Sequence, residues 1–482
     1  MNTTLLWFVI LYLIGTMCIG VYAGTRIKST ADFAIAGRSL PLAMVITTTF
    51  ATWFGAETVM GIPAKFVQGG LNAVVEDPFG ASMCLVLVGA FFASRLYKMS
   101  LLTIGDYYRH RFGKGVEIFC SIAIILSYLG WVAAQITALG LVFSVLSGGA
   151  ITAAQGMIIG TTLVLIYVLI GGMLAVAWTD FVQMIVLVVG LSLIAVMAGH
   201  QAGGADKVLA LANSNDWFKI LPERTSAGWL GFIAAALTMM LGSIPQQDVF
   251  QRVMSAKDSK TAQYGAMIGG FSYLAFAFVP MFIAASSMII MPEQTKELLA
   301  SDPQKVLPTL ILTHMPLVAQ IFFFGALVSA IKSTSSATLL APSTSFVENI
   351  LKNIHPGMKD KQVLLALRIT IFVFTALVLT YAIRMQGTAI YDLVSSAYQV
   401  TLVGAFVPLV FGLFWARSTT QGAMASIALG IGVWATFLFH APWGEAFPCQ
   451  LAGLIAALSG MVLGSLGPQL IMDHRKHLAN LA

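Results

Sequence analysis

A run of hydroxyl side chains lies inside one of the long apolar segments of this sequence. The run SAIKSTSSATLLAPSTS covers residues 329–345. On a helix, Ala330, Ser333 and Thr334 share one face because they are spaced i, i+3 and i+4. Sodium is a hard cation that binds several oxygens, and such a face can offer them. The alternative is that these hydroxyls bond to carbonyls of their own helix, and the residues alone favour that interpretation.

Lys332 lies within the same run, about 100° around the helix from Ser333. An ammonium inside a membrane helix is costly and normally pairs with an acid or extends to the interface. One interpretation is a structural ion pair with Glu57 or Asp180. Another is that the lysine charge replaces sodium, which would make transport proton-coupled or independent of ions.

Two apolar segments are interrupted by Gly and Pro in similar ways. The first reads FGAETVMGIP at 54–63, and the second reads LGSIPQQD at 241–248. Membranes tolerate broken helices where the break lines a cavity, and a broken helix exposes backbone carbonyls without a charged side chain. The alternative is a pair of harmless kinks. Five spans separate the breaks, which fits two inverted five-helix repeats with a binding site at mid-depth.

Acidic and aromatic side chains occur in several of the apolar segments. Asp77 and Asp248 are carboxylates at membrane depth, which indicates a functional role by default. Trp53 precedes the first break, and Trp131 lies in a later segment with Gln135 one helical turn beyond it. The alternatives are helix packing for the tryptophans and a capping role for Asp248. Together these residues favour a small cationic solute.

The elements that must position these residues are membrane-spanning helices. The chain has 482 residues, of which 58% are hydrophobic and 10% are charged. This composition predicts an all-α polytopic membrane protein rather than a soluble enzyme or a nucleic-acid-binding protein, despite the net charge of +6. We predict 13 spans, near 4–24, 39–67, 71–96, 116–147, 151–170, 174–198, 228–251, 263–290, 306–350, 363–385, 388–415, 419–440 and 447–470.

The distribution of basic residues predicts the orientation. Most of the 26 Lys and Arg residues fall on one set of alternate connections, while Lys65 and Lys332 fall within spans. By the positive-inside rule, this predicts an integral plasma (inner) membrane protein with its N-terminus outside and its C-terminus in the cytoplasm. The sequence has no GxxxxGK[ST] loop and no HExxH motif, so neither an ATP-driven pump nor an intramembrane enzyme is expected.

Five segments resemble the sodium:solute symporter family. The most specific is GGMLAVAWTDFVQ at 171–183, and the others are GRSLP at 37–41, GAETVMGIP at 55–63, QITALG at 135–140 and the hydroxyl run at 329–345. The resemblance is strongest to the choline-transporter branch, through TFATWFG at 49–55, LGSIPQQDVFQRV at 241–253 and LRITIFVF at 367–374.

The resemblance implies a LeuT-type fold of five parts. These are a leading helix and cytoplasmic loop at 1–38, a first five-helix repeat at 39–198, an external loop at 199–227, a second repeat at 228–415, and two trailing helices with a short tail at 416–482.

The resemblance also implies a sodium site. It places ligands at the carbonyls of Ala51, Phe54 and Ala330 and at the hydroxyls of Ser333 and Thr334. Some relatives have a second sodium site, which would use Asp180, Ser333 and Ser336 here. Ala337 stands at a further hydroxyl position of that second site, which leaves it incomplete.

For the solute, the resemblance matches Glu57 and Thr58 to substrate-facing positions in a sugar-transporting branch. Trp53 and Trp131 match two cage positions of the choline branch, and Gln246 stands at the third, where a tryptophan is expected. The predicted solute contacts are therefore Trp53, Glu57, Thr58, Asp77, Trp131, Gln135, Gln246 and Asp248.

The expected function is sodium-coupled symport of a small organic solute, best a choline-like cationic or zwitterionic amine, by a functional monomer in the lipid bilayer. The alternatives are a proton-coupled or ion-independent transporter that uses Lys332, or a membrane sensor that transports nothing.

Overall fold

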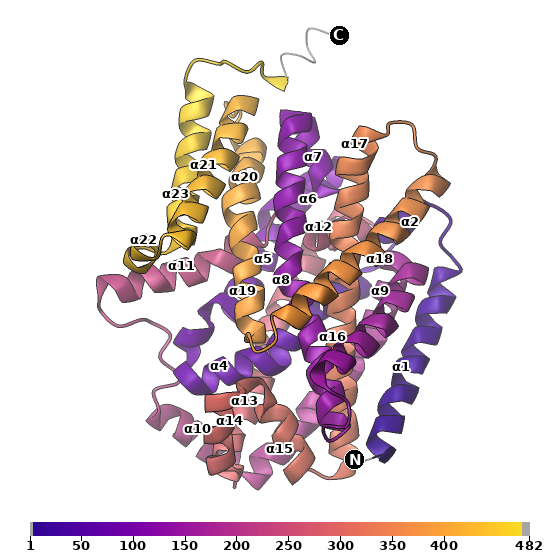
Figure 1. The fold of residues 1–482 in the computed structure, drawn as a ribbon, viewed down its shortest axis with the longest axis vertical. Coiled ribbons are helices and arrows are strands. Elements are labelled where there is room, and N and C mark those ends of the chain that lie inside the picture. The colour runs from indigo at the N-terminus through magenta and orange to yellow at the C-terminus, as the bar shows by residue number, and fades with distance from the viewer. Residues whose placement is uncertain (1–2, 475–482) are drawn as a thin grey trace.

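The computed structural model describes residues 3–474, and these residues form helices with an isolated β-bridge between Leu40 and Ala256 (Figure 1). The helices are α1 (Thr3–Gly24), α2 (Thr30–Ile35), α3 (Leu42–Trp53), α4 (Ile62–Gly69), α5 (Ala81–Leu87), α6 (Ala93–Lys98), α7 (Ile104–Phe112), α8 (Lys114–Leu146), α9 (Ala153–Gln201), α10 (Ala205–Ser214), α11 (Ser226–Gly242), α12 (Gln247–Ser255), α13 (Ser259–Ile290), α14 (Pro292–Ser301), α15 (Val306–His314), α16 (Leu317–Phe346), α17 (Lys352–Ile354), α18 (Asp360–Arg384), α19 (Ile390–Thr401), α20 (Val407–Phe414), α21 (Thr420–Phe439), α22 (Ala441–Ala446) and α23 (Cys449–Leu466).

The all-helical membrane architecture predicted from the sequence is confirmed. Among the described residues, ten helical segments are long and apolar enough to cross a membrane, or eleven if the bent pair α11–α12 counts as one span. Helices satisfy their own backbone hydrogen bonds, which is why they can cross lipid. The count of 13 spans stays a prediction.

One predicted boundary is confirmed and another is wrong. The predicted division between the spans 151–170 and 174–198 is confirmed, because the long element α9 leaves helical geometry at Gly172. Gly172 has a φ of 50°, and a Cβ there would lie 2.6 Å from the carbonyl oxygen of Phe33, so this close turn requires glycine. The prediction of one continuous span at 306–350 is wrong, because the chain leaves the helix at Met315 and Pro316, between α15 and α16.

Both predicted helix breaks are present. The first lies between α3 and α4, where Phe54 has a ψ of 72° and the π-helical turn Glu57–Gly61 precedes α4. The second lies between α11 and α12, which are bent by 45°. Each break leaves helix ends inside the protein, where side chains from other helices can meet unpaired backbone groups.

Helix α16 is the most buried of the candidate spans and packs against α8 and α9. The leading helix α1 lies at one edge, beside α9 and α16, while α21 and α23 pack together at the other (Figure 1). The hydroxyl run is therefore enclosed by several helices.

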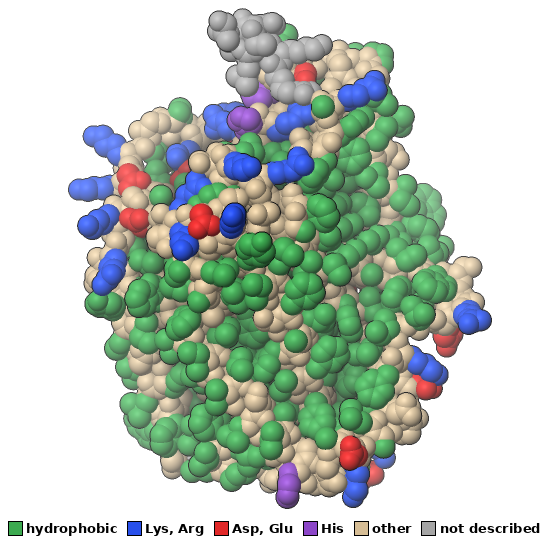
Figure 2. Space-filling view, turned by 180° about the vertical axis from the view of Figure 1, so that it is seen from behind, with side chains coloured by type: hydrophobic (Ala, Val, Ile, Leu, Met, Phe, Trp, Pro, Cys, Tyr) green, Lys and Arg blue, Asp and Glu red, His purple; other side chains and the backbone are tan. Residues whose placement is uncertain are grey.

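Basic side chains gather at the end of the molecule where α7 and α17 lie, above a broad hydrophobic belt (Figures 1 and 2). We call this the basic end, and it includes Lys98, Arg109, Arg111 and Lys114. The helices α10, α14 and α15 lie at the opposite end.

Candidate functional site

The break after α3 opens beside the hydroxyl face of α16. Phe54 is the residue at which α3 ends, and its N–H still bonds to the carbonyl of Phe50 at 2.9 Å. The next residue, Gly55, has no room for a side chain. A Cβ there would lie 2.6 Å from Glu57 Oε2, 2.8 Å from Thr334 Oγ1 and 3.0 Å from Gln135 Oε1. Three elements therefore converge on this glycine.

Hydroxyls of α16 reach the carbonyls at the end of α3. Thr334 Oγ1 donates to Thr52 O at 3.0 Å and lies 3.4 Å from Ala51 O, and Ser333 Oγ lies 3.3 Å from Ala51 O. These two hydroxyls thus cross to another helix, whereas the residues alone favoured bonds within their own helix. Ala330 is buried one turn earlier on α16.

Asp180 of α9 adds a carboxylate to the same oxygens. Its Oδ1 accepts from Ser333 Oγ at 2.5 Å, and its Oδ2 accepts from Thr48 Oγ1 at 2.6 Å. Ser336, grouped with Asp180 in the sequence analysis, instead donates to Ser333 O within its own helix. We call Thr48, Ala51, Asp180, Ser333 and Thr334 the oxygen cluster. Sequence reasoning missed Thr48, although it lies one helical turn before Ala51 and Thr52.

Lys332 points away from the oxygen cluster and toward the leading helix. Its Nζ donates to Thr16 Oγ1 at 2.8 Å and lies 4.2 Å from the centre of the Tyr167 ring. Among residues 3–474, no ion pair within 4.0 Å joins Lys332 to Glu57 or Asp180. The predicted direct ion pair is therefore replaced by a hydroxyl and an aromatic face.

Glu57 is held by two side chains of α8. Trp131 Nε1 donates to Glu57 Oε1 at 3.1 Å, and Gln135 Nε2 donates to Glu57 Oε2 at 2.6 Å. Gln135 also accepts from the N–H of Ala56 at 3.0 Å. Because Gln135 bonds both the carboxylate and the backbone, it fixes the unwound segment between α3 and α4.

Three aromatic rings pack together beside Glu57. The ring centres of Trp53 and Trp131 are 5.8 Å apart, and Tyr398 of α19 lies 5.9 Å from Trp53 and 5.5 Å from Trp131. We call these residues the aromatic cluster, and all three are buried. Tyr128 stacks on the outer side of Trp131 at 6.0 Å. Tyr398 supplies a third ring that sequence reasoning missed.

Thr58 and Asp77 are joined through a tyrosine of α13. Tyr273 OH donates to Asp77 Oδ1 at 2.5 Å and lies 3.0 Å from Thr58 Oγ1. The hydroxyl of Thr58 in turn donates to the carbonyl of Trp53 at 3.1 Å. Asp77 is therefore connected to the aromatic cluster by a short chain of polar contacts.

The second break brings Gln246 and Asp248 to α8. Gln246 Nε2 donates to Ser127 Oγ at 2.8 Å, and Tyr128 OH donates to Asp248 Oδ1 at 2.5 Å. The Asp248 side chain therefore bonds to another helix, and Gln246 is the residue that precedes α12. Asp248 thus meets Tyr128, which stacks on Trp131 of the aromatic cluster.

Acids outnumber bases among the buried charges that surround the breaks. The buried acids are Glu57, Glu76, Asp77, Asp180 and Asp248, and the buried bases are Arg252 and Lys332. Among the other buried acids, Glu117 and Glu348 near the basic end pair with Arg109 and Lys352. This excess of carboxyl groups favours a cation as the bound species, because a cation would stabilise their ionised form.

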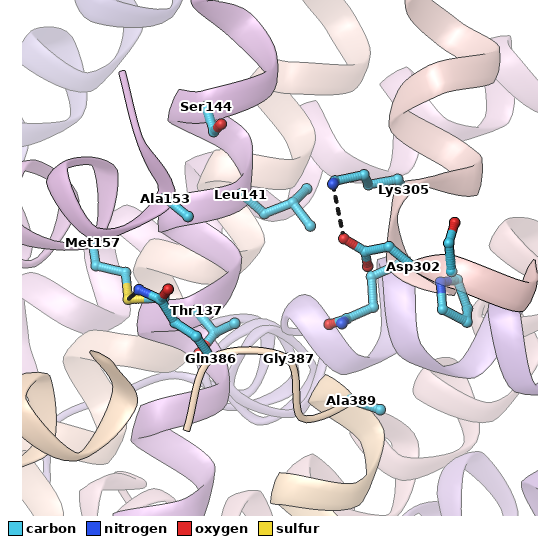
Figure 3. Close-up of a pocket in the computed structure, with 13 residues that line it drawn as sticks. Thr137, Leu141, Ser144, Ala153, Met157, Asp302, Lys305, Gln386, Gly387 and Ala389 are labelled. Carbon is cyan, nitrogen blue, oxygen red and sulfur yellow. Dashed lines mark hydrogen bonds and ion pairs between the residues drawn. The ribbon is translucent and has the colours of Figure 1, made fainter. Parts of the chain in front are cut away.

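Figure 3 shows a cavity of about 270 Å³ that is lined on α8 by Thr137, Leu141 and Ser144. These residues lie beyond Gln135, toward the end of α8 that is opposite the basic end. Residues of α8 and α9 form one wall, and Ser301–Lys305 with the turn before α19 form the others. An ion pair of 3.0 Å between Asp302 and Lys305 faces it.

Comparison with known proteins identifies the family of this chain. The model of the sodium:solute symporter family matches residues 33–430. The human high-affinity choline transporter 1 is 27% identical over 444 residues, which cover 89% of this chain and 75% of the relative. The high-affinity proline transporter PutP of Bacillus subtilis is 27% identical over 480 residues, covering 95% of this chain and 98% of the relative.

Solved structures share the fold. A Na⁺-coupled sialic acid symporter in a substrate-bound outward-open state has a TM-score of 0.82 at 21% identity, covering 97% of this chain and 99% of the symporter. The nucleobase-cation symporter MHP1 in a closed conformation has a TM-score of 0.60 at 15% identity, covering 95% of this chain and 99% of MHP1. The neighbours thus include transporters with the LeuT-type fold. This chain is a membrane transporter, not an enzyme, and it belongs to the sodium:solute symporter family.

Proposed function

We propose that this transporter couples sodium entry to the uptake of a small cationic or zwitterionic amine, such as choline, by alternating access. The observation that carries the proposal is the position of the oxygen cluster next to the aromatic cluster. Both clusters use the last turns of α3, which ends at the first break, so an ion bound by one cluster would order the backbone that supports the other.

The donor types of the oxygen cluster support sodium binding. The oxygen cluster and the neighbouring carbonyl of Thr52 together offer two carbonyls, one carboxylate and three hydroxyls. These groups meet where α3, α9 and α16 approach one another. Hard cations prefer oxygen ligands, and unwound helices supply carbonyls at membrane depth. Phe54 and Ala330 are proposed as further carbonyl ligands because they lie at the end of α3 and one turn before Ser333.

Aromatic rings and excess acids support a solute with an ammonium group. A desolvated cation–π contact contributes about 2 kcal/mol when the cation lies within about 6 Å of the ring centre. The three centres of the aromatic cluster are 5.5–5.9 Å apart, so a cation about 4–5 Å above their plane would meet that limit for all three. Glu57 and Asp77 would supply the opposite charge.

Contacts at both ends of the protein are suited to alternating access. At the basic end, Leu40 N–H donates to Ser255 O at 2.9 Å, which joins the start of α3 to the end of α12. At the opposite end, Lys65 Nζ and Asp392 Oδ1 are 3.0 Å apart and join α4 to α19. We propose that these contacts open in turn, and that sodium favours the state open to the outside.

The positive-inside rule supports a cytoplasmic basic end and an external opposite end, in the plasma (inner) membrane. We propose the monomer as the functional unit, because the proposed ligands all come from one chain. Lys332 is proposed to stabilise the contact between α1 and α16, because its ammonium faces Thr16 and Tyr167 instead of the oxygen cluster.

Uptake into proteoliposomes tests this proposal. Labelled choline, glycine betaine and proline are offered at fixed pH with an inward gradient of sodium, and the control vesicles receive potassium instead. Uptake of choline or betaine that requires sodium is expected. Equal uptake in potassium would reject sodium coupling and favour the alternative in which Lys332 replaces the ion.

A further inference from the structure

The cavity beside α8 offers a binding surface that the transport site does not use. On the same measure one water needs about 10–15 Å³, so a cavity of about 270 Å³ has room for several waters or one small amine. In the orientation proposed above, the cavity lies on the external side. It can therefore be reached before the contact between Lys65 and Asp392 opens.

Its charged wall carries both signs. Asp302 Oδ2 and Lys305 Nζ are 3.0 Å apart, and their side chains remain 31% and 43% exposed. The pair faces Leu141 of α8 across the cavity (Figure 3). A solute that bears a carboxylate and an ammonium could bind to this pair, with its carboxylate on Lys305 and its ammonium on Asp302. Each of the four charges would then have an opposite charge beside it.

The α8 wall contains a buried hydroxyl that lacks a partner. Thr137 lines the cavity, is 8% exposed, and makes no hydrogen bond to the part of the chain that the structure describes. Leaving a buried hydroxyl unpaired costs about 1–3 kcal/mol, so such groups normally bond to water or to a ligand. This hydroxyl therefore points to an occupant of the cavity that accepts or donates a hydrogen bond.

Two elements connect the cavity to the transport site. Thr137 lies two residues beyond Gln135, which is about 3 Å along α8. Gln304, another lining residue, accepts from the N–H of Ile390 at 3.1 Å, and Ile390 begins the helix that carries Tyr398. A solute in the cavity would thus contact the same helices that hold Glu57 and the aromatic cluster.

We propose that this cavity is an external binding site, where a zwitterionic amine binds before it enters the transport site. This proposal rests on the proposed function. The carboxylate of the solute binds Lys305 and accepts from Thr137, and its ammonium group binds Asp302. A solute without a carboxylate, such as choline, uses Asp302 alone. Lys305 therefore distinguishes zwitterions from simple cations.

The test compares Lys305→Met with Lys296→Met in proteoliposomes, with labelled glycine betaine and choline as separate probes. Lys296 pairs with Glu293 at 3.3 Å on the neighbouring α14 and does not line the cavity, so it controls for loss of a surface ion pair. We expect Lys305→Met to raise the KM for betaine about two- to fivefold, the range of a partly exposed charge contact, without raising that for choline.

Two further variants keep the test independent of the ion pair's effect on folding. Asp302→Asn should raise the KM for both probes, and Thr137→Val should raise it for betaine while Asp302 and Lys305 stay paired. The Vmax and the melting temperature of each variant should match those of Lys296→Met.

The outcomes separate the two proposals. If the unmodified protein takes up neither probe, the proposed function and the cavity site both fail. If it takes up both probes and all cavity variants behave like Lys296→Met, the cavity site alone fails. A rise in KM for choline equal to that for betaine in Lys305→Met would also overturn the site, because it would show no recognition of the carboxylate.

Discussion

Gly55→Ala is the substitution that the geometry of the first break penalises most directly. The new Cβ would lie 2.6 Å from Glu57 Oε2, 2.8 Å from Thr334 Oγ1 and 3.0 Å from Gln135 Oε1. Contacts this short force neighbours to move. Those neighbours form the 2.6 Å bond between Gln135 and Glu57 and the 3.0 Å bond between Gln135 and the N–H of Ala56.

Overpacking of this kind costs about 1–3 kcal/mol, which corresponds to a change of about five- to 150-fold in an equilibrium constant. Because the displaced groups belong to both the oxygen cluster and the contacts of Glu57, the sodium and solute affinities should both fall. The assay is equilibrium binding of choline to purified protein over a series of sodium concentrations.

Gly325→Ala on α16 is the matched control, because a Cβ at Gly325 would meet no atom within 4 Å. It should bind like the unmodified protein. If Gly55→Ala binds sodium and choline as Gly325→Ala does, the end of α3 at the first break is not the shared support of the two sites. A fall in solute affinity with unchanged sodium affinity would also refute the shared support.

Three further substitutions address separate parts of the site. Thr334→Ala should lower the apparent sodium affinity by about fivefold or more, because it removes one buried oxygen ligand. The control is Thr380→Ala, which removes a hydroxyl that bonds within its own helix and should leave the sodium affinity unchanged. Equal sodium affinities for the two variants would contradict this prediction. Trp53→Ala should abolish the rise in melting temperature on adding choline, and a retained rise would exclude the aromatic cluster. Lys332→Met should lose its bond to Thr16 but keep sodium-dependent uptake, and uptake that no longer responds to sodium would show that the lysine couples the ion.

Much of the fold could be predicted because its signals are local in the sequence. Gly55, Gly242 and Pro245 marked both helix breaks, and long apolar runs marked the helices. The pair Gly171–Gly172 likewise marked the turn within α9. The break at Met315 and Pro316 also had a local signal, a proline, but it was missed because apolar length alone was used to set that boundary.

The partners within the site could not be predicted in the same way. Tyr398 is more than 250 residues from Trp131, and Tyr273 is 196 residues from Asp77. Nothing in either local sequence specifies these contacts, which depend on how the two repeats pack. Lys332 was matched with acids because a buried charge normally needs one, but the packing of α1 and α9 supplied Thr16 and Tyr167 instead.

The most direct test of the central claim is the mutual effect of sodium and solute on binding to the unmodified protein. Linkage requires that sodium raise the affinity for choline by the same factor by which choline raises the affinity for sodium. We predict a reciprocal factor of about five or more, and no such effect when potassium replaces sodium. Identical choline affinity in sodium and in potassium would contradict the account.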